Sequence, residues 1–409
     1  METILIVGGR VETLVKAREL GLRVLFMQHR DRMLPGHVEA ADALFMVDYT
    51  DWNLIRPIVL AAHASYGFTA VVSLGEQVME TVGRINDLLG LGGTSYEVAA
   101  RFKDKLAMRA HLAESSVATV AAEQVDAPEQ VRDFGRRHGF PIVLKPIDNT
   151  ASRGVQIIEQ EEGVLAAWQA VTALRTRDDL ILGQFFPVGR MLVEQYIAGP
   201  EYSVETFSFG GRHSVVAITE KYTDGVVEAA HALPARLTDA DETAVVAYVR
   251  SFLSAMGLRD GVAHTEIKLS PGGPVVIESH DRIAGERIPD LVRDAYEIDL
   301  EQYAVASPFG LLPELPDRPE PLRAAATRFI NAEPGIVTGI AGTEDVLSHP
   351  ALIELDMFVK EGDRRVPVTD NFERSGQVLA TGVDTAAALE TCDLLAGKIA
   401  VLTTPGASD

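Results

Sequence analysis

Two glutamates on a predicted β-hairpin are the residues best suited to chemistry. Glu266 lies in a strand predicted over 262–269 and Glu278 in a strand predicted over 274–279, with a Pro-Gly-Gly turn between them. Side chains alternate along a strand, so both carboxylates can point to one face of the hairpin. Two close carboxylates repel each other unless a cation lies between them, and such oxygen donors suit Mg²⁺ shared with nucleotide phosphates. The apolar neighbours of both glutamates favour this metal site over a solvated strand face.

A second group combines a lysine with a loop of small residues. The apolar strand predicted over 142–145 ends at Lys145, and the loop 148–154 (Asp-Asn-Thr-Ala-Ser-Arg-Gly) leads into another strand over 155–158. Such a loop can bring backbone N–H groups against phosphate oxygens, as a flap between strands rather than a P-loop. A plain turn beside a snorkelling lysine is the alternative that these residues leave open.

A third group surrounds a Gly-Pro turn. A strand predicted over 191–196 carries Glu194 and ends near Gly199-Pro200, and an alternating strand follows from Tyr202 to Phe209. Backbone groups at this crossing can read the edge of an adenine, and Glu201 can accept hydrogen bonds from ribose hydroxyls. Charged residues near turns are commonly just solvated, so this group indicates little by itself.

Hydrophobic patterning predicts the scaffold that positions these residues. Short buried strands alternate with helices over 1–94, which predicts an α/β unit with a parallel sheet covered on both faces. Residues 95–310 mix antiparallel strands with helices. The proline-rich stretch 308–321 is typical of a linker, and residues 311–409 form a smaller predicted α+β unit.

Composition excludes several classes of function. The 409 residues include 37 Lys and Arg against 59 Asp and Glu, a net charge of −22, so we expect neither nucleic-acid nor membrane binding. The single cysteine, Cys392, excludes an internal disulfide framework and a Cys-based zinc site. The sequence patterns of P-loop NTPases, zincins and nucleophile-elbow hydrolases are absent. With neither a signal-peptide pattern nor a long apolar run, the expected location is the cytoplasm.

Taken in order, the three groups resemble the ATP-grasp superfamily. The order is a Lys103-Asp104-Lys105 helix, the strand lysine with its loop, a Val-Glu-x-Tyr-Ile segment over 193–197, and Glu266 followed by Glu278-x-x-x-Arg282. The similarity extends from about residue 3 to 307. Gly-Pro-Glu-Tyr-Ser-Val-Glu over 199–205 and Gly-Glu-Arg-Ile over 285–288 look most like the carboxylate–amine ligases of the amino-acid (dipeptide) ligase group.

The resemblance implies an ATP-grasp fold with an N-terminal pre-ATP-grasp domain, a central domain with a mobile lid at about 120–197, and a small C-terminal α+β domain. The residues that it assigns to ATP are Lys105, Lys145, Ser152, Gly154, Glu194, Gln195, Tyr196, Ile197 and Glu201. The residues that it assigns to catalysis are Lys145, Ser152, Arg153 and Arg282, and Arg282 would stabilise an acyl phosphate. Glu266, Glu278 and His280 are the residues assigned to Mg²⁺, with Mn²⁺ as an alternative ion.

One position departs from the family pattern. The family usually has Asn two residues after the second metal glutamate, where this chain has His280. Imidazole can bind a metal but is a softer ligand than Mg²⁺ prefers. His280 therefore has three interpretations: a metal ligand, a residue that orients Glu278, or a contact to substrate.

The implied activity is an ATP-dependent ligation of a small carboxylic acid or amino acid to an amine through an acyl phosphate, releasing ADP and phosphate. The alternatives are an ATP-grasp carboxylase that acts through carboxyphosphate and a nucleotide-binding protein without ligase activity. The expected partners are the small-molecule carboxylate and amine, and by resemblance a second copy of the chain in a homodimer. Specificity is expected from the loops around His213, Tyr222, His231, His264 and Glu286-Arg287.

Overall fold

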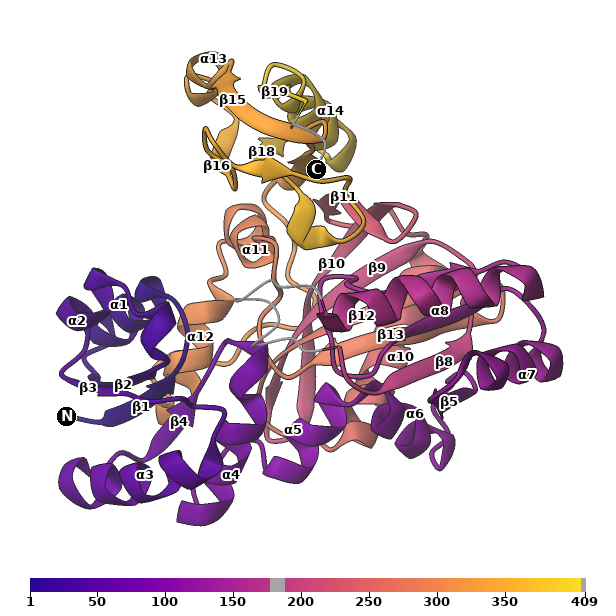
Figure 1. The fold of residues 1–409 in the computed structure, drawn as a ribbon. Helices are drawn as coiled ribbons and strands as arrows, with labels where there is room; N and C mark the ends of the chain where they lie inside the picture. The colour runs from indigo at the N-terminus through magenta and orange to yellow at the C-terminus, as the bar shows by residue number, and fades with distance from the viewer. Residues whose placement is uncertain (177–187, 406–409) are drawn as a thin grey trace.

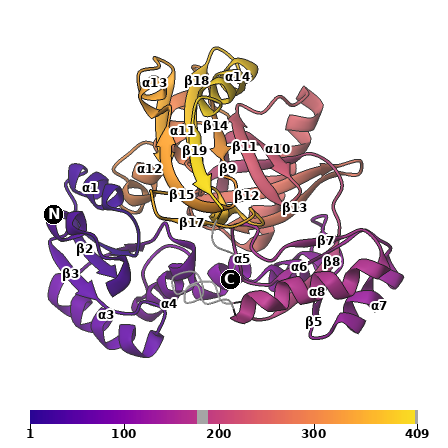
Figure 2. The same ribbon diagram turned by 45° about the horizontal axis from the view of Figure 1, so that its top comes forward.

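The computed structural model describes residues 1–176 and 188–405. An N-terminal unit, a small four-stranded sheet and a C-terminal unit surround a long central sheet (Figures 1 and 2). Within the described ranges, the helices are all too short or too polar to cross a membrane. The fold class predicted from the sequence is confirmed in its mixture of parallel α/β and antiparallel α+β units.

The N-terminal unit contains a parallel sheet in the order β3-β2-β1-β4. Alternate residues of the fully buried strand β1 enter different cores, Leu5 on one face and Ile6 on the other, because helices cover both faces. Its elements are β1 (Thr3–Val7), α1 (Val11–Glu19), β2 (Arg23–Gln28), α2 (Pro35–Ala40), β3 (Ala43–Met46), α3 (Trp52–Tyr66), β4 (Ala70–Val72), the 3₁₀ turn η2 (Glu76–Val78) and α4 (Met79–Leu89).

The central sheet begins with five antiparallel strands in the order β13-β12-β9-β10-β11. Helices α5, α6 and α10 pack on one face around Phe252, and α11 and α12 pack on the other around Leu291. The elements are α5 (Tyr96–Lys103), α6 (Lys105–Ala113), β9 (Glu201–Phe209), β10 (Arg212–Asp224), β11 (Val227–Leu233), α10 (Asp239–Met256), β12 (Gly261–Ser270), β13 (Gly273–His280), α11 (Ile288–Tyr296) and α12 (Leu300–Ala306).

The four-stranded sheet, in the order β5-β8-β6-β7, lies where the sequence predicts a lid. Its apolar core lies between the strands and the helices α7 and α8. The elements are β5 (Ala122–Val125), α7 (Pro128–His138), β6 (Ile142–Pro146), β7 (Gln156–Ile158), α8 (Val164–Ala173) and β8 (Met191–Gln195). The lid prediction covers 120–197, of which 177–187 lie outside the described residues, and its mobility stays a prediction.

The C-terminal unit extends the central sheet instead of standing apart from it. Strand β14 pairs with β11, with Ala230 opposite Arg328, and β18 and β16 follow, so the sheet has eight strands. The predicted linker packs against the molecule through the buried Leu315. The elements are β14 (Ala324–Ile330), β15 (Gly335–Ala341), α13 (Thr343–Leu347), β16 (Leu352–Met357), β17 (Arg364–Arg365), the 3₁₀ turn η6 (Asn371–Glu373), β18 (Gly376–Gly382), α14 (Thr385–Ala396) and β19 (Ala400–Thr404). The domain boundaries at 94 and 310 stay predictions.

The turn between β8 and β9 yields a stability prediction. Gly199 has φ +125°, and a Cβ there would lie 2.1 Å from the carbonyl oxygen of Leu269, which is backbone and cannot rotate away. We expect Gly199→Ala to lower the free energy of unfolding by about 2 kcal/mol or more. Gly272→Ala is the matched control, because its nearest atom would be the Ser270 hydroxyl at 3.7 Å. Urea denaturation of both variants measures the difference, and equal midpoints would contradict the prediction.

Candidate active site

Two adjoining cavities meet at the β12–β13 hairpin. The first lies between the lid sheet and the central sheet, and the second, of about 770 Å³, lies between the central sheet, the N-terminal unit and the C-terminal unit. The residues that line both are Thr150, Ser152, Glu228, Glu266 and Glu278. Ligands in the two cavities would therefore meet at the predicted metal glutamates.

The first cavity collects most of the residues predicted to bind ATP. Its lining includes Lys105, Lys145, Ser152, Arg153, Glu194, Gln195, Tyr196, Ile197, Glu201, Glu266 and Glu278. Gly154 closes the same loop with φ +78°. His280 and Arg282 line the second cavity. These residues come from five strands, one helix and the loops that follow β6, β8 and β13, so only the packing of the sheets brings them together.

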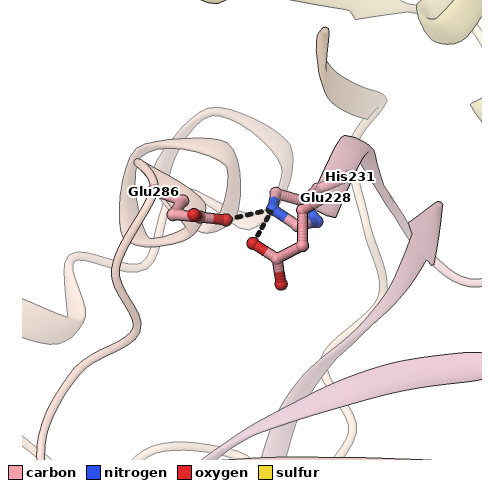
Figure 3. Close-up of side chains that lie close together, drawn as sticks. All are labelled: Glu228, His231 and Glu286. Atoms are coloured by element: carbon pink, nitrogen blue, oxygen red, sulfur yellow. Dashed lines mark hydrogen bonds and ion pairs between the residues drawn. The ribbon is translucent and has the colours of Figure 1, made fainter. Parts of the chain in front are cut away.

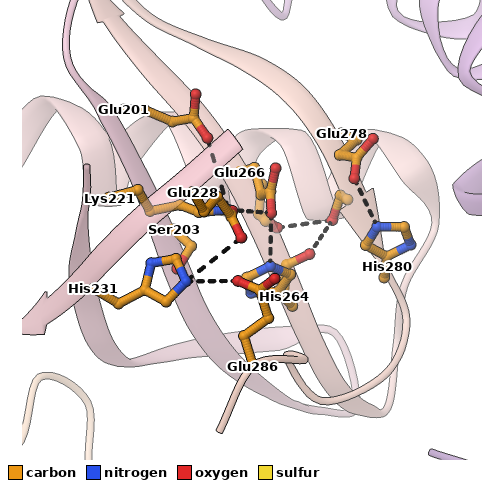
Figure 4. Close-up of polar contacts among 12 residues, drawn as sticks. Glu201, Ser203, Lys221, Glu228, His231, His264, Glu266, Glu278, His280 and Glu286 are labelled. Carbon is orange, nitrogen blue, oxygen red and sulfur yellow. Dashed lines mark hydrogen bonds and ion pairs between the residues drawn. The ribbon is translucent and has the colours of Figure 1, made fainter. Parts of the chain in front are cut away.

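The two glutamates of the hairpin lie directly opposite each other. Glu266 and Glu278 are register partners in the antiparallel pair, and both are largely buried. Lys221 Nζ lies 2.5 Å from Glu266 Oε1, and Lys105 Nζ lies 2.8 Å from Glu278 Oε2 (Figure 4 shows the Lys221 contact). Burial opposes ionisation, but the Lys221 charge lowers the pKa of Glu266, and the charges of Lys105 and His280 hold the pKa of Glu278 well below its usual value.

This donor set fits a hard divalent cation. Glu266 and Glu278 offer ionised carboxylate oxygens on facing positions of two paired strands, which is the ligand type that Mg²⁺ prefers. The lysines now neutralise charges that a metal ion would neutralise. Lys105 would then be available to anions in the first cavity, and Lys221 to anions in the second.

Each glutamate has a histidine beside it. His264 Nε2 lies 3.1 Å from Glu266 Oε1, and His280 Nε2 lies 3.2 Å from Glu278 Oε1. The His264 Nδ1 atom contacts the buried Glu205 at 2.8 Å. Burial disfavours the charged ring, yet Glu205 raises the pKa of His264 to about 9. The 3.2 Å distance makes His280 a hydrogen-bond partner of Glu278. The sequence analysis names His264 only for specificity, and the mirrored spacing His264-x-Glu266 and Glu278-x-His280 is the signal for its contact with Glu266.

A buried ion-pair network joins the lid to the hairpin. Glu194 on β8 lies 2.6 Å from Lys145 Nζ and 3.0 Å from Arg109 Nε, and Arg109 also donates to the carbonyl oxygen of Val276 at 2.8 Å. Burial opposes ionisation, but Arg109 and Lys145 lower the pKa of Glu194 to about 2. The Glu194 carboxylate is therefore ionised and already paired with these two cations. Arg109 was not predicted, although it lies one helical turn after Lys105 on α6.

The loop between β6 and β7 is held from two sides. Lys105 Nζ donates to the carbonyl oxygen of Asn149 at 2.8 Å, and the backbone N–H of Asn371 donates to that of Ala151 at 3.0 Å. Ala151 and Ser152 both have φ +57°, a left-handed conformation that costs energy in residues other than glycine. A strained loop thus lies between an α6 lysine and the C-terminal unit, at the wall shared by the two cavities.

Arg282 is positioned by a residue of the N-terminal unit. Its Nη2 lies 2.6 Å from Glu76 Oε2, and its Nη1 donates to the carbonyl oxygen of Ile283 at 2.7 Å. Burial opposes ionisation of Glu76, but His280 and Arg282 lower its pKa to about 2. Glu76 was not predicted, because it lies some 200 residues away in the sequence and only the packing of the two units brings it close.

Glu228 and Glu286, which line the second cavity, form a mixed-charge cluster with His231 (Figure 3). His231 Nε2 lies 2.7 Å from Glu286 Oε2 and 3.5 Å from Glu228 Oε2. Ligand atoms of these three residues lie within 4.8 Å of one another, as a metal site would require. However, Lys221 pairs with Glu228 and Arg374 pairs with Glu286. These cations already balance both carboxylates, so the cluster suits a polar organic ligand better than a second metal ion.

The expected specificity loops divide into two sets. His264, Glu286 and Arg287 line the second cavity, and His231 contacts Glu286. His213 and Tyr222 themselves are absent from the described linings of both cavities, although Thr223, next to Tyr222, lines the first cavity.

Strand geometry explains why the side chains of His213 and Tyr222 lie away from the two cavities. His213 lies at the remote end of β10, 2.8 Å from the Ser208 hydroxyl, because a strand of this length carries its ends far apart. Tyr222 follows Lys221 and therefore points to the opposite face, where it packs on the C-terminal core.

Three family models match the chain in this arrangement. They are the ATP-grasp N-terminal domain over 14–93, the ATP-grasp domain over 138–290, and the L-amino acid ligase C-terminal domain 2 over 328–404. The fold is similar to the crystal structure of an L-amino acid ligase from Bacillus licheniformis, with a TM-score of 0.82 at 21% identity over 99% of each chain.

Sequence relatives agree with the domain matches. The chain is 24% identical over 332 residues to dapdiamide A synthase of Enterobacter agglomerans, covering 77% of this chain and 75% of that protein. It is 28% identical over 320 residues to the uncharacterized protein y4rH of Sinorhizobium fredii, covering 77% of this chain and 64% of that protein.

Domain composition and fold identify the chain as a member of the ATP-grasp superfamily. Within the superfamily, its C-terminal family model and its named relatives are those of carboxylate–amine ligases of the amino-acid ligase type. The resemblance read from the sequence is thereby confirmed.

The Glu194 network yields a prediction on pH dependence. The pKa of Glu194 falls from 4.5 to about 2 in the folded protein, so its contribution is present above pH 4.5 and is lost as the pH falls toward 2. That contribution is on the order of 3 kcal/mol. At neutral pH, Glu194→Gln leaves two buried cations unpaired and should destabilise the fold by about 3 kcal/mol or more. The stability difference between wild type and variant should shrink steadily below pH 4.5.

Chemical denaturation at several pH values measures this difference. Glu123→Gln is the control, because Glu123 forms an exposed pair with Arg137 that solvent screens, and it should change stability little at any pH. A difference for Glu194→Gln that does not vary with pH would refute the ion-pair origin of the stabilisation.

Proposed function

We propose that the chain is an ATP-dependent ligase that joins the carboxylate of a small acid or amino acid to an amine and releases ADP and phosphate. The observation that carries the proposal is the shared wall of the two cavities. Lys105, Lys145 and Arg153 line the first cavity, Arg282 and Glu286 line the second, and Thr150, Ser152 and Glu228 line both. ATP in the first cavity would present its terminal phosphate to a carboxylate in the second.

Phosphoryl transfer needs positioning and charge neutralisation more than covalent chemistry. Lys105 and Lys145 are buried cations at the wall of the first cavity, and each would exchange a glutamate partner for phosphate oxygens. Glu266 and Glu278 would hold Mg²⁺, which supplies charge neutralisation at the phosphates when bound. His280 would orient Glu278, the role that its 3.2 Å contact favours among the three interpretations.

Arg282 is suited to the carboxylate that is activated. Its guanidinium is planar and always charged, so it can hold the two oxygens of a carboxylate or of an acyl phosphate. Glu76 fixes one side of the guanidinium through the 2.6 Å contact. The acyl phosphate would then react with an amine in the second cavity, while the 150–153 loop excludes the water that would hydrolyse it.

The charges of the second cavity favour amino acids as substrates. Glu76, Glu228 and Glu286 offer anionic groups for ammonium, and Arg282 and Arg374 offer cationic groups for carboxylate. Relatives named alanine–anticapsin ligase and L-arginine-specific L-amino acid ligase support this substrate class. The matched regions cover 57% and 78% of those proteins, so we do not assign their particular substrates to this chain.

A screen of ADP release over pairs of amino acids and small acids, with mass detection of the product, tests the proposal. ADP release that requires both a carboxylate and an amine, with an amide product, would support it. Bicarbonate-dependent ADP release without an added amine would support the carboxylase alternative. ATP binding without turnover across the screen would support a nucleotide-binding protein. Gel filtration with light scattering tests the proposed homodimer separately.

The hairpin yields a prediction on activity. Glu278→Gln keeps the shape and one acceptor of the side chain but removes the charge proposed to hold Mg²⁺, so ADP formation should fall by about a hundredfold or more. Glu220→Gln is the matched control, because Glu220 is also buried and ion-paired, with Arg236, but lies outside the described linings of both cavities. Circular dichroism checks that both variants fold. Unchanged turnover in Glu278→Gln would overturn the metal assignment.

A further inference from the structure

A third cavity lies behind the active site, on the opposite side of the segment that carries Arg282. It has a volume of about 350 Å³ and lies between β4 and α4 of the N-terminal unit, the ends of β9 and β12, and α12. His280 and Arg282 line the second cavity, whereas Asp281 between them lines the third. The proposed ligase chemistry uses none of the polar groups that line this cavity.

Two buried acceptor atoms on its wall lack hydrogen-bond partners. Asp281 is 8% exposed and its Oδ2 atom is unpartnered, and Asn86 is 2% exposed and its Oδ1 atom is unpartnered. The orientation of the Asn86 amide is fixed, because its Nδ2 donates at 2.9 Å to the carbonyl oxygen of Thr94, which can only accept. Buried acceptors without partners are costly, so each indicates a donor that arrives from the cavity.

About half of the lining is hydrophobic, the remainder consists mainly of Gly, Ser and Thr residues, and no cationic group is among the described residues of the wall. Its hydrophobic residues are Ala70, Val71, Val72, Leu74, Met79, Val82, Phe209, Val262, Ala304 and Pro308. Among the described residues that line it, none is Lys, Arg or His. The cavity therefore offers a ligand the buried carboxylate of Asp281, the exposed carboxylate of Asp260 on its rim and neutral acceptors, but no cation to balance a ligand carboxylate. This separates it from the second cavity, which carries charges of both signs.

We propose that this third cavity is a binding site for a small apolar primary amine, whose nitrogen donates to Asp281 and Asn86 and whose hydrocarbon part packs on the apolar wall. The volume is within the range of ordinary ligand pockets, which combine apolar walls with a small number of polar groups. An amino acid would bring a carboxylate into a wall without cations, so the site discriminates against the substrates proposed for the second cavity.

Isothermal titration calorimetry of isoamylamine into the full chain without nucleotide tests the proposal. Saturable binding of one amine per chain is expected, and saturating leucine should not displace it, because leucine adds a carboxylate to the same carbon skeleton. Isoamyl alcohol, which lacks the charge, should bind more weakly. Absence of saturable binding, as when the cavity holds ordered water only, or displacement by leucine would overturn the proposal.

Three variants locate the bound amine. Asp281→Asn should weaken amine binding about tenfold or more. Asp260→Asn is the control, because Asp260 is an exposed carboxylate on the rim of the same cavity and should leave the affinity almost unchanged. Ala304→Leu fills the cavity, leaves both acceptors intact and should abolish binding of the amine. This variant tests the site independently if Asp281→Asn does not fold. Wild-type affinity in Asp281→Asn or in Ala304→Leu would overturn the site.

Discussion

The arrangement of the site depends on how the repulsion between two largely buried carboxylates is balanced. Glu266 and Glu278 face each other in register on adjacent strands, where the interior screens their charges poorly. Such a pair is stable only if cations lie against it, and Lys221 from β10 and Lys105 from α6 do so. In the proposed function a metal ion would take over the neutralisation of the two carboxylates, and Lys105 would then pair with phosphate oxygens.

The same requirement extends through the molecule as a chain of alternating charges. Arg109 and Lys145 surround Glu194 in the lid, Glu76 of the N-terminal unit pairs with Arg282, and Arg374 of the C-terminal unit pairs with Glu286. Each unit thus contributes a charged group near the hairpin. Buried ion pairs add little net stability, but breaking one leaves an unpaired charge, so the units are held in a specific arrangement. The acidic chain, with a net charge of −22, keeps its buried cations at these points.

The continuous central sheet explains why the C-terminal unit takes part in the site. Because β14 pairs with β11, the segment that follows β16 returns over the cavity, and η6 contacts both the 150–153 loop and Glu228. Read from sequence, the proline-rich stretch indicates a linker and therefore a separate domain. Strand pairing is a long-range choice that local composition does not encode, so this contact could not have been predicted.

The sequence by itself indicated the hairpin and the ordered motifs of the candidate site, but not strands β10 and β11. Period-two patterning and the Pro-Gly-Gly turn were sufficient to bring Glu266 and Glu278 to one place, because a hairpin is a local structure. Ordered motifs then indicated the family. The tertiary structure alone decided the partners: Glu76, Arg109, Lys221 and Arg374 are ordinary charged residues in the sequence, and their neighbours lie tens to hundreds of residues away. Likewise, the length of β10 places His213 far from both cavities, and the alternation of side chains along β10 turns Tyr222 to the opposite face. Local patterns specify which side chains share a face, whereas only packing between distant segments specifies what that face meets.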